Sequence, residues 1–223
     1  MMSSKKILLA VAALLVWTAW ALADDFLPPD FRGDPLTVTA EWDMTADFTI
    51  EPYSYYNYPP DNLNTVGDGQ HQLGTAFTHA HFTQTVFWRP DGTGDGVAYT
   101  SDLPGQIDFF LVNWTDPYPF KHIWIQITYG GQGVPVVSGV VGPNPETNTW
   151  TDPTYGGFQQ AIDVNPNQRV EYWILMPNPD REHIYLDLPP FTEVDQVLID
   201  TISTQEPVGN EETSWSGVKA LYR

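Results

Sequence analysis

Apolar and polar side chains alternate through most of the chain after residue 35, and this alternation predicts β-strands. The clearest case runs from His122 to Tyr129, where three isoleucines face one way and His122, Trp124, Gln126 and Thr128 face the other. Successive strand residues point to opposite sides of a sheet, so a period of two indicates a strand with one buried face. The same pattern predicts strands over residues 36–42, 46–50, 75–88, 106–113, 122–129, 134–141, 159–164, 169–176, 183–188, 194–203 and 218–222.

The connections between these segments are mostly short and rich in Gly, Pro, Asn and Asp, which is typical of turns. Residues 51–74 are the exception and are expected to form a long loop with local turns. No segment after residue 23 keeps a helical period for about ten residues. About ten short strands predict an all-β fold, a two-sheet antiparallel β-sandwich of the jelly-roll type, although an eight-stranded barrel would show the same periodicity.

The first 23 residues have the three parts of a secretory signal peptide. Lys5 and Lys6 precede an apolar run over residues 7–20, and Ala21-Leu22-Ala23 forms a small-residue cleavage site. The apolar run is shorter than the roughly 17 to 25 residues that span a bilayer. We therefore expect export to the periplasm, cell surface or extracellular medium, with no stable membrane anchor after cleavage.

The residues after the leader suit a single β domain. We expect a Pro- and Asp-rich N-terminal segment over residues 24–35, because prolines cannot donate hydrogen bonds within a sheet. The β-sandwich then covers residues 36–203, and residues 204–223 form a C-terminal linker and final strand.

Charge and cysteine content narrow the classes of partner. The chain has 28 acidic and 9 basic residues, with a formal net charge of −19, so binding to nucleic acid is excluded by charge repulsion. Divalent cations, neutral glycans and other extracellular surface proteins suit this surface better. Cysteine is absent, so an exported chain that is free to form disulfides must gain its stability in other ways.

The chain resembles a group of exported bacterial proteins of uncertain function in four segments: Leu27 to Gly33, Pro117 to Thr128, Tyr172 to Pro179 and Val194 to Thr201. These proteins are related to those that carry a PEP-CTERM sorting domain. The resemblance implies a secreted β-sandwich with no assigned chemistry. Gln205-Glu-Pro207 stands where the sorting tail would begin, and no apolar span or arginine cluster follows it. We therefore do not extend the group's membrane-sorted fate to this chain.

Residues 91–102 match the spacing of a calcium-binding loop, with oxygen-bearing residues at positions one, three, five and twelve and glycine at position six. The candidate ligands are Asp91, Thr93, Asp95, Val97 and Asp102, with Val97 acting through its backbone carbonyl. Threonine at position three and the short Asp at position twelve depart from the usual pattern. A Gly/Asp turn between two strands is the alternative interpretation.

His79 and His81 lie on one face of a predicted strand, and side chains at that spacing converge on one metal ion in many metalloenzymes. His71 is the candidate third ligand. No Glu follows within five residues, so the alternative is a hydrogen-bonded, metal-free pair of histidines.

Tyrosines gather in a loop bounded by prolines, where their rings could stack on sugar faces. The candidates for glycan contact are Tyr53, Tyr55, Tyr56, Tyr58 and Trp88, with Trp114, Trp124 and Trp150 as extensions of such a platform. The alternative is that these rings fill the core or cover a sheet edge.

Sequence motifs of hydrolases and nucleotide-binding enzymes are absent from the chain, including G-x-S-x-G, H-E-x-x-H and the P-loop. We therefore favour a non-catalytic binding or structural module of the cell surface or extracellular matrix, stabilised by Ca²⁺ and contacting glycans. The alternatives are a secreted carbohydrate-active or metal-dependent enzyme and a subunit of an extracellular layer or filament.

Overall fold

The computed structural model describes residues 25–47, 58–66, 78–91, 96–114, 117–144, 146 and 149–205. Thirteen strands make up the fold over these residues: β1 Thr37–Trp42, β2 Asn62–Val66, β3 His79–Phe82, β4 Val86–Pro90, β5 Gly96–Thr100, β6 Gly105–Val112, β7 Phe120–Gly131, β8 Val136–Asn144, β9 Thr149–Tyr155, β10 Gly157–Asn165, β11 Gln168–Leu175, β12 Arg181–Leu188 and β13 Thr192–Thr204. The strands form two antiparallel sheets, which confirms the prediction of an all-β fold. Over the same residues, no helix is long and apolar enough to cross a membrane.

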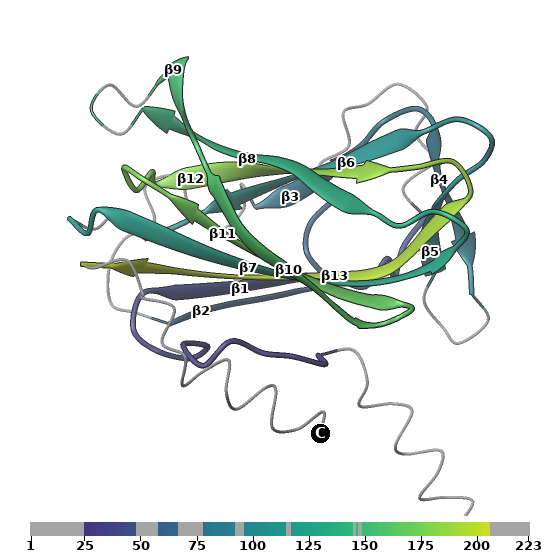
Figure 1. The fold of residues 1–223 in the computed structure, drawn as a ribbon, viewed down its shortest axis with the longest axis horizontal. Helices are drawn as coiled ribbons and strands as arrows, with labels where there is room; N and C mark the ends of the chain where they lie inside the picture. The colour runs from purple at the N-terminus through teal and green to yellow at the C-terminus, as the bar shows by residue number, and fades with distance from the viewer. Residues whose placement is uncertain are drawn as a thin grey trace, which may run out of the picture.

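The larger sheet, here called sheet A, has eight strands. Its main order is β10-β11-β7-β13-β1-β2, and β5 joins the N-terminal part of β13 and carries β4 beside it. The long strands β7 and β13 form its centre, with Lys121 opposite Ser203 at one end and Gly131 opposite Thr192 at the other. Figure 1 shows sheet A as one layer of the molecule.

The smaller sheet, here called sheet B, has the order β3-β6-β12-β8-β9. It lies over sheet A in Figure 1, so the two sheets form a β-sandwich-like pair of layers. In β6 and β12 every second side chain points between the layers, including Phe109 and Ile184, which are fully buried. The intervening residues, such as Phe110 and His183, form the outer face of sheet B.

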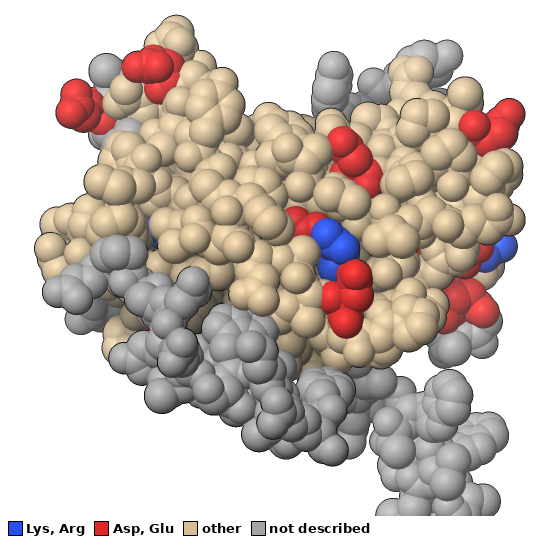
Figure 2. All heavy atoms as spheres, in the orientation of Figure 1, with Lys and Arg blue, Asp and Glu red and all other residues tan. Residues whose placement is uncertain are grey.

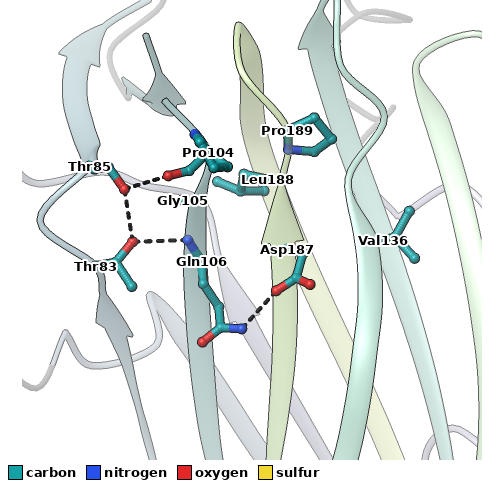
Figure 3. A pocket seen from close by; sticks show the side chains of 9 residues that line it. All are labelled: Thr83, Thr85, Pro104, Gly105, Gln106, Val136, Asp187, Leu188 and Pro189. Atoms are coloured by element: carbon teal, nitrogen blue, oxygen red, sulfur yellow. Dashed lines mark hydrogen bonds between the residues drawn. The ribbon is translucent and has the colours of Figure 1, made fainter. Parts of the chain in front are cut away.

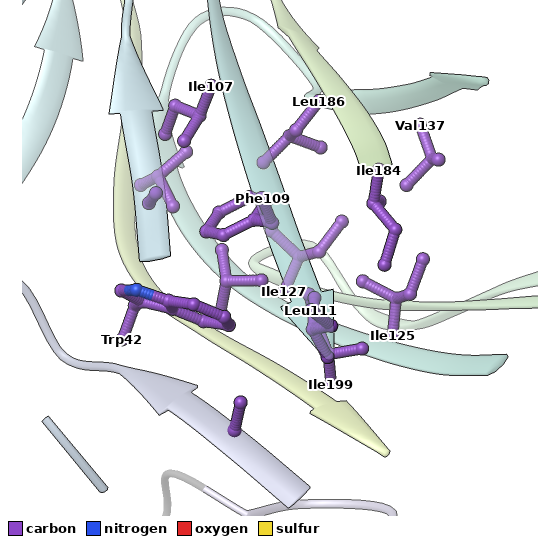
Figure 4. Packing of buried hydrophobic residues seen from close by; sticks show 14 of the residues in the cluster. Trp42, Ile107, Phe109, Leu111, Ile125, Ile127, Val137, Ile184, Leu186 and Ile199 are labelled. Carbon is purple, nitrogen blue, oxygen red and sulfur yellow. The ribbon is translucent and has the colours of Figure 1, made fainter. Parts of the chain in front are cut away.

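One apolar core fills the space between the sheets (Figure 4). Trp42 of sheet A contacts Phe109 of sheet B, with ring centroids 4.8 Å apart. Isoleucines of β7 and β12 surround this pair. These residues share the alternation that predicted the strands, because the same period that makes a strand amphipathic places its apolar side chains in the core.

The N-terminal segment covers part of the outer face of sheet A. The Leu27 backbone N–H donates a hydrogen bond to Gln126 Oε1 (2.8 Å), and Trp124 Nε1 donates to the Leu27 carbonyl (2.9 Å). Arg32 pairs with the buried carboxylate of Asp200 at 2.5 Å. Figure 1 shows this segment, in dark purple, along sheet A on the side away from sheet B. It has no strand structure, as its prolines predicted.

Three strands were not predicted, and one predicted strand is divided. β2 lies inside the expected long loop, while β5 contains Gly96 and β9 contains Pro153. The single strand expected over residues 75–88 is two strands, β3 in sheet B and β4 in sheet A. The final strand predicted over residues 218–222 lies outside the described residues.

Candidate functional site

The outer face of sheet B carries a row of side chains that crosses all five strands and is aromatic or imidazole on every strand except β8. The register of the sheet places His79, Phe110, His183, Val141 and Tyr155 in neighbouring positions of successive strands. The His79 and Phe110 rings stack with centroids 5.1 Å apart, and Phe110 meets His183 edge to face at 4.6 Å. We call this set, together with His81, Asp108, Trp150 and Tyr185, the aromatic–histidine face.

Trp150 and Tyr155 form the most open part of the aromatic–histidine face. Trp150 is 40% exposed and Tyr155 is 71% exposed, although both side chains are large and apolar. The Trp150 ring lies 4.8 Å from the His183 ring, and the Arg181 guanidinium lies 5.8 Å from the Trp150 centroid. The exposed rings therefore continue the row formed by His79, Phe110 and His183.

Polar groups occupy the centre of the same face. Asp108 lies opposite both His81 and Tyr185 in the sheet register, and Asp108 Oδ2 lies 3.3 Å from His183 Nδ1. Burial lowers the pKa of His81, Asp108 raises it and His183 lowers it further. A neutral imidazole both donates and accepts a hydrogen bond, so His81 can serve a hydroxyl group in either role near neutral pH.

A shallow groove of about 600 Å³ continues this face toward the Leu188 end of β12 (Figure 3). Gln106 Nε2 donates a hydrogen bond to Asp187 Oδ1 (2.7 Å) on its floor. Figure 3 shows the two threonines on one side of this pair and Val136 and Pro189 on the other. Its lining consists of Thr83, Thr85, Pro104, Gly105, Gln106, Val136, Asp187, Leu188 and Pro189.

The structure brings two of the three candidate metal-binding histidines together. The rings of His79 and His81 lie 4.6 Å apart on β3, while His71 lies outside the described residues. Within the described part of the chain, no group of three or more His, Cys, Asp or Glu side chains could hold a metal ion. Both histidines instead belong to the aromatic–histidine face.

The candidate calcium loop is spread along the β4–β5 hairpin. Asp91 directly follows β4, Val97 lies within β5 and is buried, and Asp102 lies beyond the far end of β5. The five residues of β5 span about 13 Å, whereas oxygen ligands lie about 2.3 to 2.6 Å from a Ca²⁺ ion. Asp91 and Asp102 therefore lie near opposite ends of β5. Thr93 and Asp95 lie outside the described residues.

The predicted aromatic platform lies partly in the core. Tyr58 is 3% exposed and its hydroxyl accepts a hydrogen bond from the Ala46 N–H (3.1 Å), so its ring cannot meet a ligand at the surface. Trp88 is half-buried and its Nε1 donates to the Met44 carbonyl (2.7 Å). Tyr53, Tyr55 and Tyr56 lie outside the described residues.

The sequence reasoning missed Phe110, His183 and Tyr185 as site residues. All three occupy outward positions of predicted strands, and that alternation was the available signal. The signal was insufficient because a period of two assigns a side chain to a face without saying which strands lie beside it.

No family model matches the chain, and no curated protein matches it. The fold and the site therefore define a class by geometry: an all-β protein of two antiparallel sheets with an aromatic–histidine face on its smaller sheet.

Proposed function

We propose that this chain is an exported, non-catalytic β-sandwich module that binds neutral glycans on the aromatic–histidine face. The observation that carries the proposal is the row of rings across sheet B, which ends in the exposed side chains of Trp150 and Tyr155. Large exposed rings are costly to leave in water, and a contiguous set of them is typical of a binding surface.

The chemistry of the face suits a sugar. A pyranose ring presents C–H groups on its faces and hydroxyl groups around its edge, so it contacts an aromatic ring with its face and polar groups with its edge. The rings of Trp150 and Tyr155 supply the first kind of contact. The imidazole of His81, the carboxylate of Asp187 and the Gln106 amide supply the second.

Charge favours a neutral glycan over an acidic one. The chain carries a net charge of −19, and Asp108 and Asp187 both lie on the proposed binding face. An acidic sugar would be repelled by both carboxylates. Figure 2 shows the molecule from the side, in the orientation of Figure 1, and acidic groups outnumber basic ones on the surface seen there.

The positions and hydrogen-bond partners of Asp108 and Asp187 favour binding over glycoside hydrolysis. Hydrolysis requires two carboxyl groups that face each other across the scissile bond. Asp108 and Asp187 come from adjacent strands on the same outer face of sheet B, where Asp108 pairs with His183 and Asp187 accepts a hydrogen bond from Gln106. Carboxylates held in this way are suited to orienting hydroxyl groups.

The proposal includes export and a jelly-roll type of sandwich. The leader-like pattern of the first 23 residues supports export. The jelly-roll assignment is supported by the path of the chain, which changes sheet between β2 and β3, β3 and β4, β5 and β6, β6 and β7, β7 and β8, β9 and β10, β11 and β12, and β12 and β13. Repeated crossing between two antiparallel sheets is typical of that class.

Titration with neutral polysaccharides tests the proposed function. Soluble glucan, mannan, xylan and galactan are titrated against the purified chain while tryptophan fluorescence and heat are recorded. We expect at least one polysaccharide to bind and Trp150→Ala to weaken that binding by about tenfold or more, as for a central aromatic contact.

Phe87→Ala is the matched control, because Phe87 is 39% exposed but lies on β4 of sheet A. This variant should bind as tightly as the wild type. Failure of all four polysaccharides to bind, or equal loss of affinity in both variants, would contradict the proposal.

A further inference from the structure

A cluster of polar side chains lies inside the apolar core at the end of the sandwich where β6 leads into β7. Asn113 and Glu182 come from sheet B, and Lys121, Thr201 and Ser203 come from sheet A. Each has the same strand parity as the apolar core residues next to it, so all five point between the sheets. Asn113, Glu182 and Thr201 are 0% exposed, Lys121 is 1% exposed and Ser203 is 4% exposed.

Hydrogen bonds link three of these side chains, Thr201, Asn113 and Glu182, in a chain. Asn113 Nδ2 donates a hydrogen bond to Glu182 Oε2. Thr201 Oγ1 donates to Asn113 Oδ1 (2.7 Å), so the Asn113 carboxamide is held at both its nitrogen and its oxygen. Glu182 Oε1 is buried and has no hydrogen-bond partner among the described residues.

Lys121 approaches Asn113 and Glu182 from sheet A, where Ser203 holds its amino group. Lys121 Nζ donates to Ser203 Oγ at 2.5 Å, and Ser203 lies two residues after Thr201 on the same inward face of β13. The charge of Lys121 acts directly on Glu182 and lowers the pKa of its carboxyl. Lysine, asparagine and glutamate therefore meet in one dry compartment between the sheets.

Burial favours the neutral form of the Glu182 carboxyl. Burial raises the pKa of Glu182 to about 8, against the lowering effects of Lys121 and the Asn113 hydrogen bond, while Asp180 raises it further. Burial disfavours a charged ammonium in the same way. Transfer of a proton from Lys121 to Glu182 removes both charges from the core and leaves a neutral amine, which is the nucleophilic form of lysine.

We propose that Lys121 and Asn113 form an intramolecular isopeptide bond that joins sheet A to sheet B, with Glu182 as the proton carrier. The Lys121 amine attacks Cγ of Asn113, and the Thr201 hydroxyl stabilises the charge that develops on Oδ1. The new C–N bond forms as the bond from Cγ to Nδ2 breaks. Glu182 passes the proton from Nζ to Nδ2, and one ammonia leaves, so no oxidant or other reactant is required.

Asn178 is the competing target for the Lys121 amine, because Asn178 Nδ2 also donates a hydrogen bond to Ser203 Oγ (3.1 Å). Its Nδ2 donates in addition to the Tyr118 carbonyl (3.0 Å), whereas the Asn113 amide is the one bonded to Glu182. A leaving nitrogen must receive a proton, and only the contact between Asn113 and Glu182 provides the donor. This contact makes Asn113, and not Asn178, the partner of Lys121 in the proposed bond.

Intact-mass measurement of the purified, denatured chain tests the cross-link. With the N-terminus identified by sequencing, we expect a mass one ammonia lower than the mass calculated from the sequence. Trypsin should fail to cut after Lys121. A protease that cuts before Asp116, between the two partners, should leave its two fragments joined. A full calculated mass, with normal cleavage after Lys121, would overturn the proposal and leave a non-covalent buried pair.

Variants then assign the roles of the residues. Glu182→Gln keeps the size of the side chain but cannot carry the proton, and its mass should equal the calculated value. Lys219→Met and Asn178→Ser are the matched controls and should retain the deficit of one ammonia. A deficit that persists in Glu182→Gln, or fragments that join Lys121 to Asn178, would overturn the mechanism as stated. The peptide map of the wild type decides the existence of the bond even where a variant does not fold.

Discussion

Glu182 shows how burial changes the acid–base behaviour of one residue. It lies in β12 within a run of apolar inward-facing positions, and its side chain is removed from water. A charged carboxylate is unfavourable there, so burial raises its pKa from 4.5 to about 8. The pairing of β12 with β6 on one side and β8 on the other places this residue inside the core.

Stability should therefore depend on pH through Glu182. The folded chain holds the proton more tightly than the unfolded chain, so the stabilisation is complete below pH 4.5 and is lost as pH rises through about 8. We expect the free energy of unfolding in urea to fall across this range by at most about 1.4 kcal/mol per pH unit. In Glu182→Gln this fall should disappear.

The exposed residue Glu146 provides the control for that measurement. Glu146→Gln should keep the profile of the wild type. A wild-type profile that is flat between pH 5 and 8, or a fall that survives in Glu182→Gln, would show that Glu182 is not the responsible group.

At the scale of elements, the β4–β5 hairpin separates residues that are close to a calcium-binding pattern in sequence. A helical or coiled loop of twelve residues wraps around an ion, but a five-residue strand extends away from it. Asp91 lies at the turn of the hairpin, and Asp102 lies past its other end.

We expect Asp102→Ala to leave the response of the melting temperature to millimolar Ca²⁺ unchanged from that of the wild type. The measurement is thermal unfolding with and without Ca²⁺, because an ion that binds only the folded chain raises the melting temperature. Asp91→Ala, directly after β4, measures how much this end of the hairpin contributes to any change in melting temperature with Ca²⁺. Loss of a wild-type Ca²⁺ response in Asp102→Ala would show that the twelve-residue pattern acts as one site.

β10 is the element that bears on assembly into a layer or filament. It forms one edge of sheet A, and its outer side pairs with no strand in the described part of the chain. Register shifts between Phe158 and Gln160 and between Asp163 and Asn165 interrupt its ladder with β11. Such bulges hinder edge-to-edge pairing in natural sheets, so the edge of β10 does not favour the filament alternative.

At the scale of the whole molecule, one core joins the two sheets. Trp42 and Phe109 contact each other across the layers, and both are fully buried (Figure 4). We expect Phe109→Ala to lower the free energy of unfolding by about 3 to 5 kcal/mol, because it leaves a cavity between the sheets. Denaturant unfolding followed by tryptophan fluorescence measures this change.

Leu103→Ala is the control for that prediction, since Leu103 is 55% exposed in the connection between β5 and β6. Its effect should stay within about 0.5 kcal/mol of the wild type. Equal effects of the two substitutions would show that Phe109 does not join the sheets in the way its contacts indicate.

The long strands were predictable from sequence because their signal is local. β7 and β12 each alternate over eight or more residues, and the alternation reports the burial of one face. β5 and β9 were not predictable in this way, because Gly96 and Pro153 weaken the local preference and pairing with β13, β4 and β8 supplies the order. Tertiary contacts outweigh propensity in short strands.

The candidate site likewise combines residues that the sequence predicted with residues that only the tertiary structure brings together. His79 and His81 were singled out from their spacing, but their partners Phe110, Asp108 and His183 come from strands that are distant in the chain. The sequence by itself determined the all-β class, the core-facing positions of the long strands and the acidic charge, because each depends on neighbouring residues or on composition. Only the tertiary structure decided which outward side chains form one surface and which polar residues meet in the core, because strand order and register are set by contacts between distant segments.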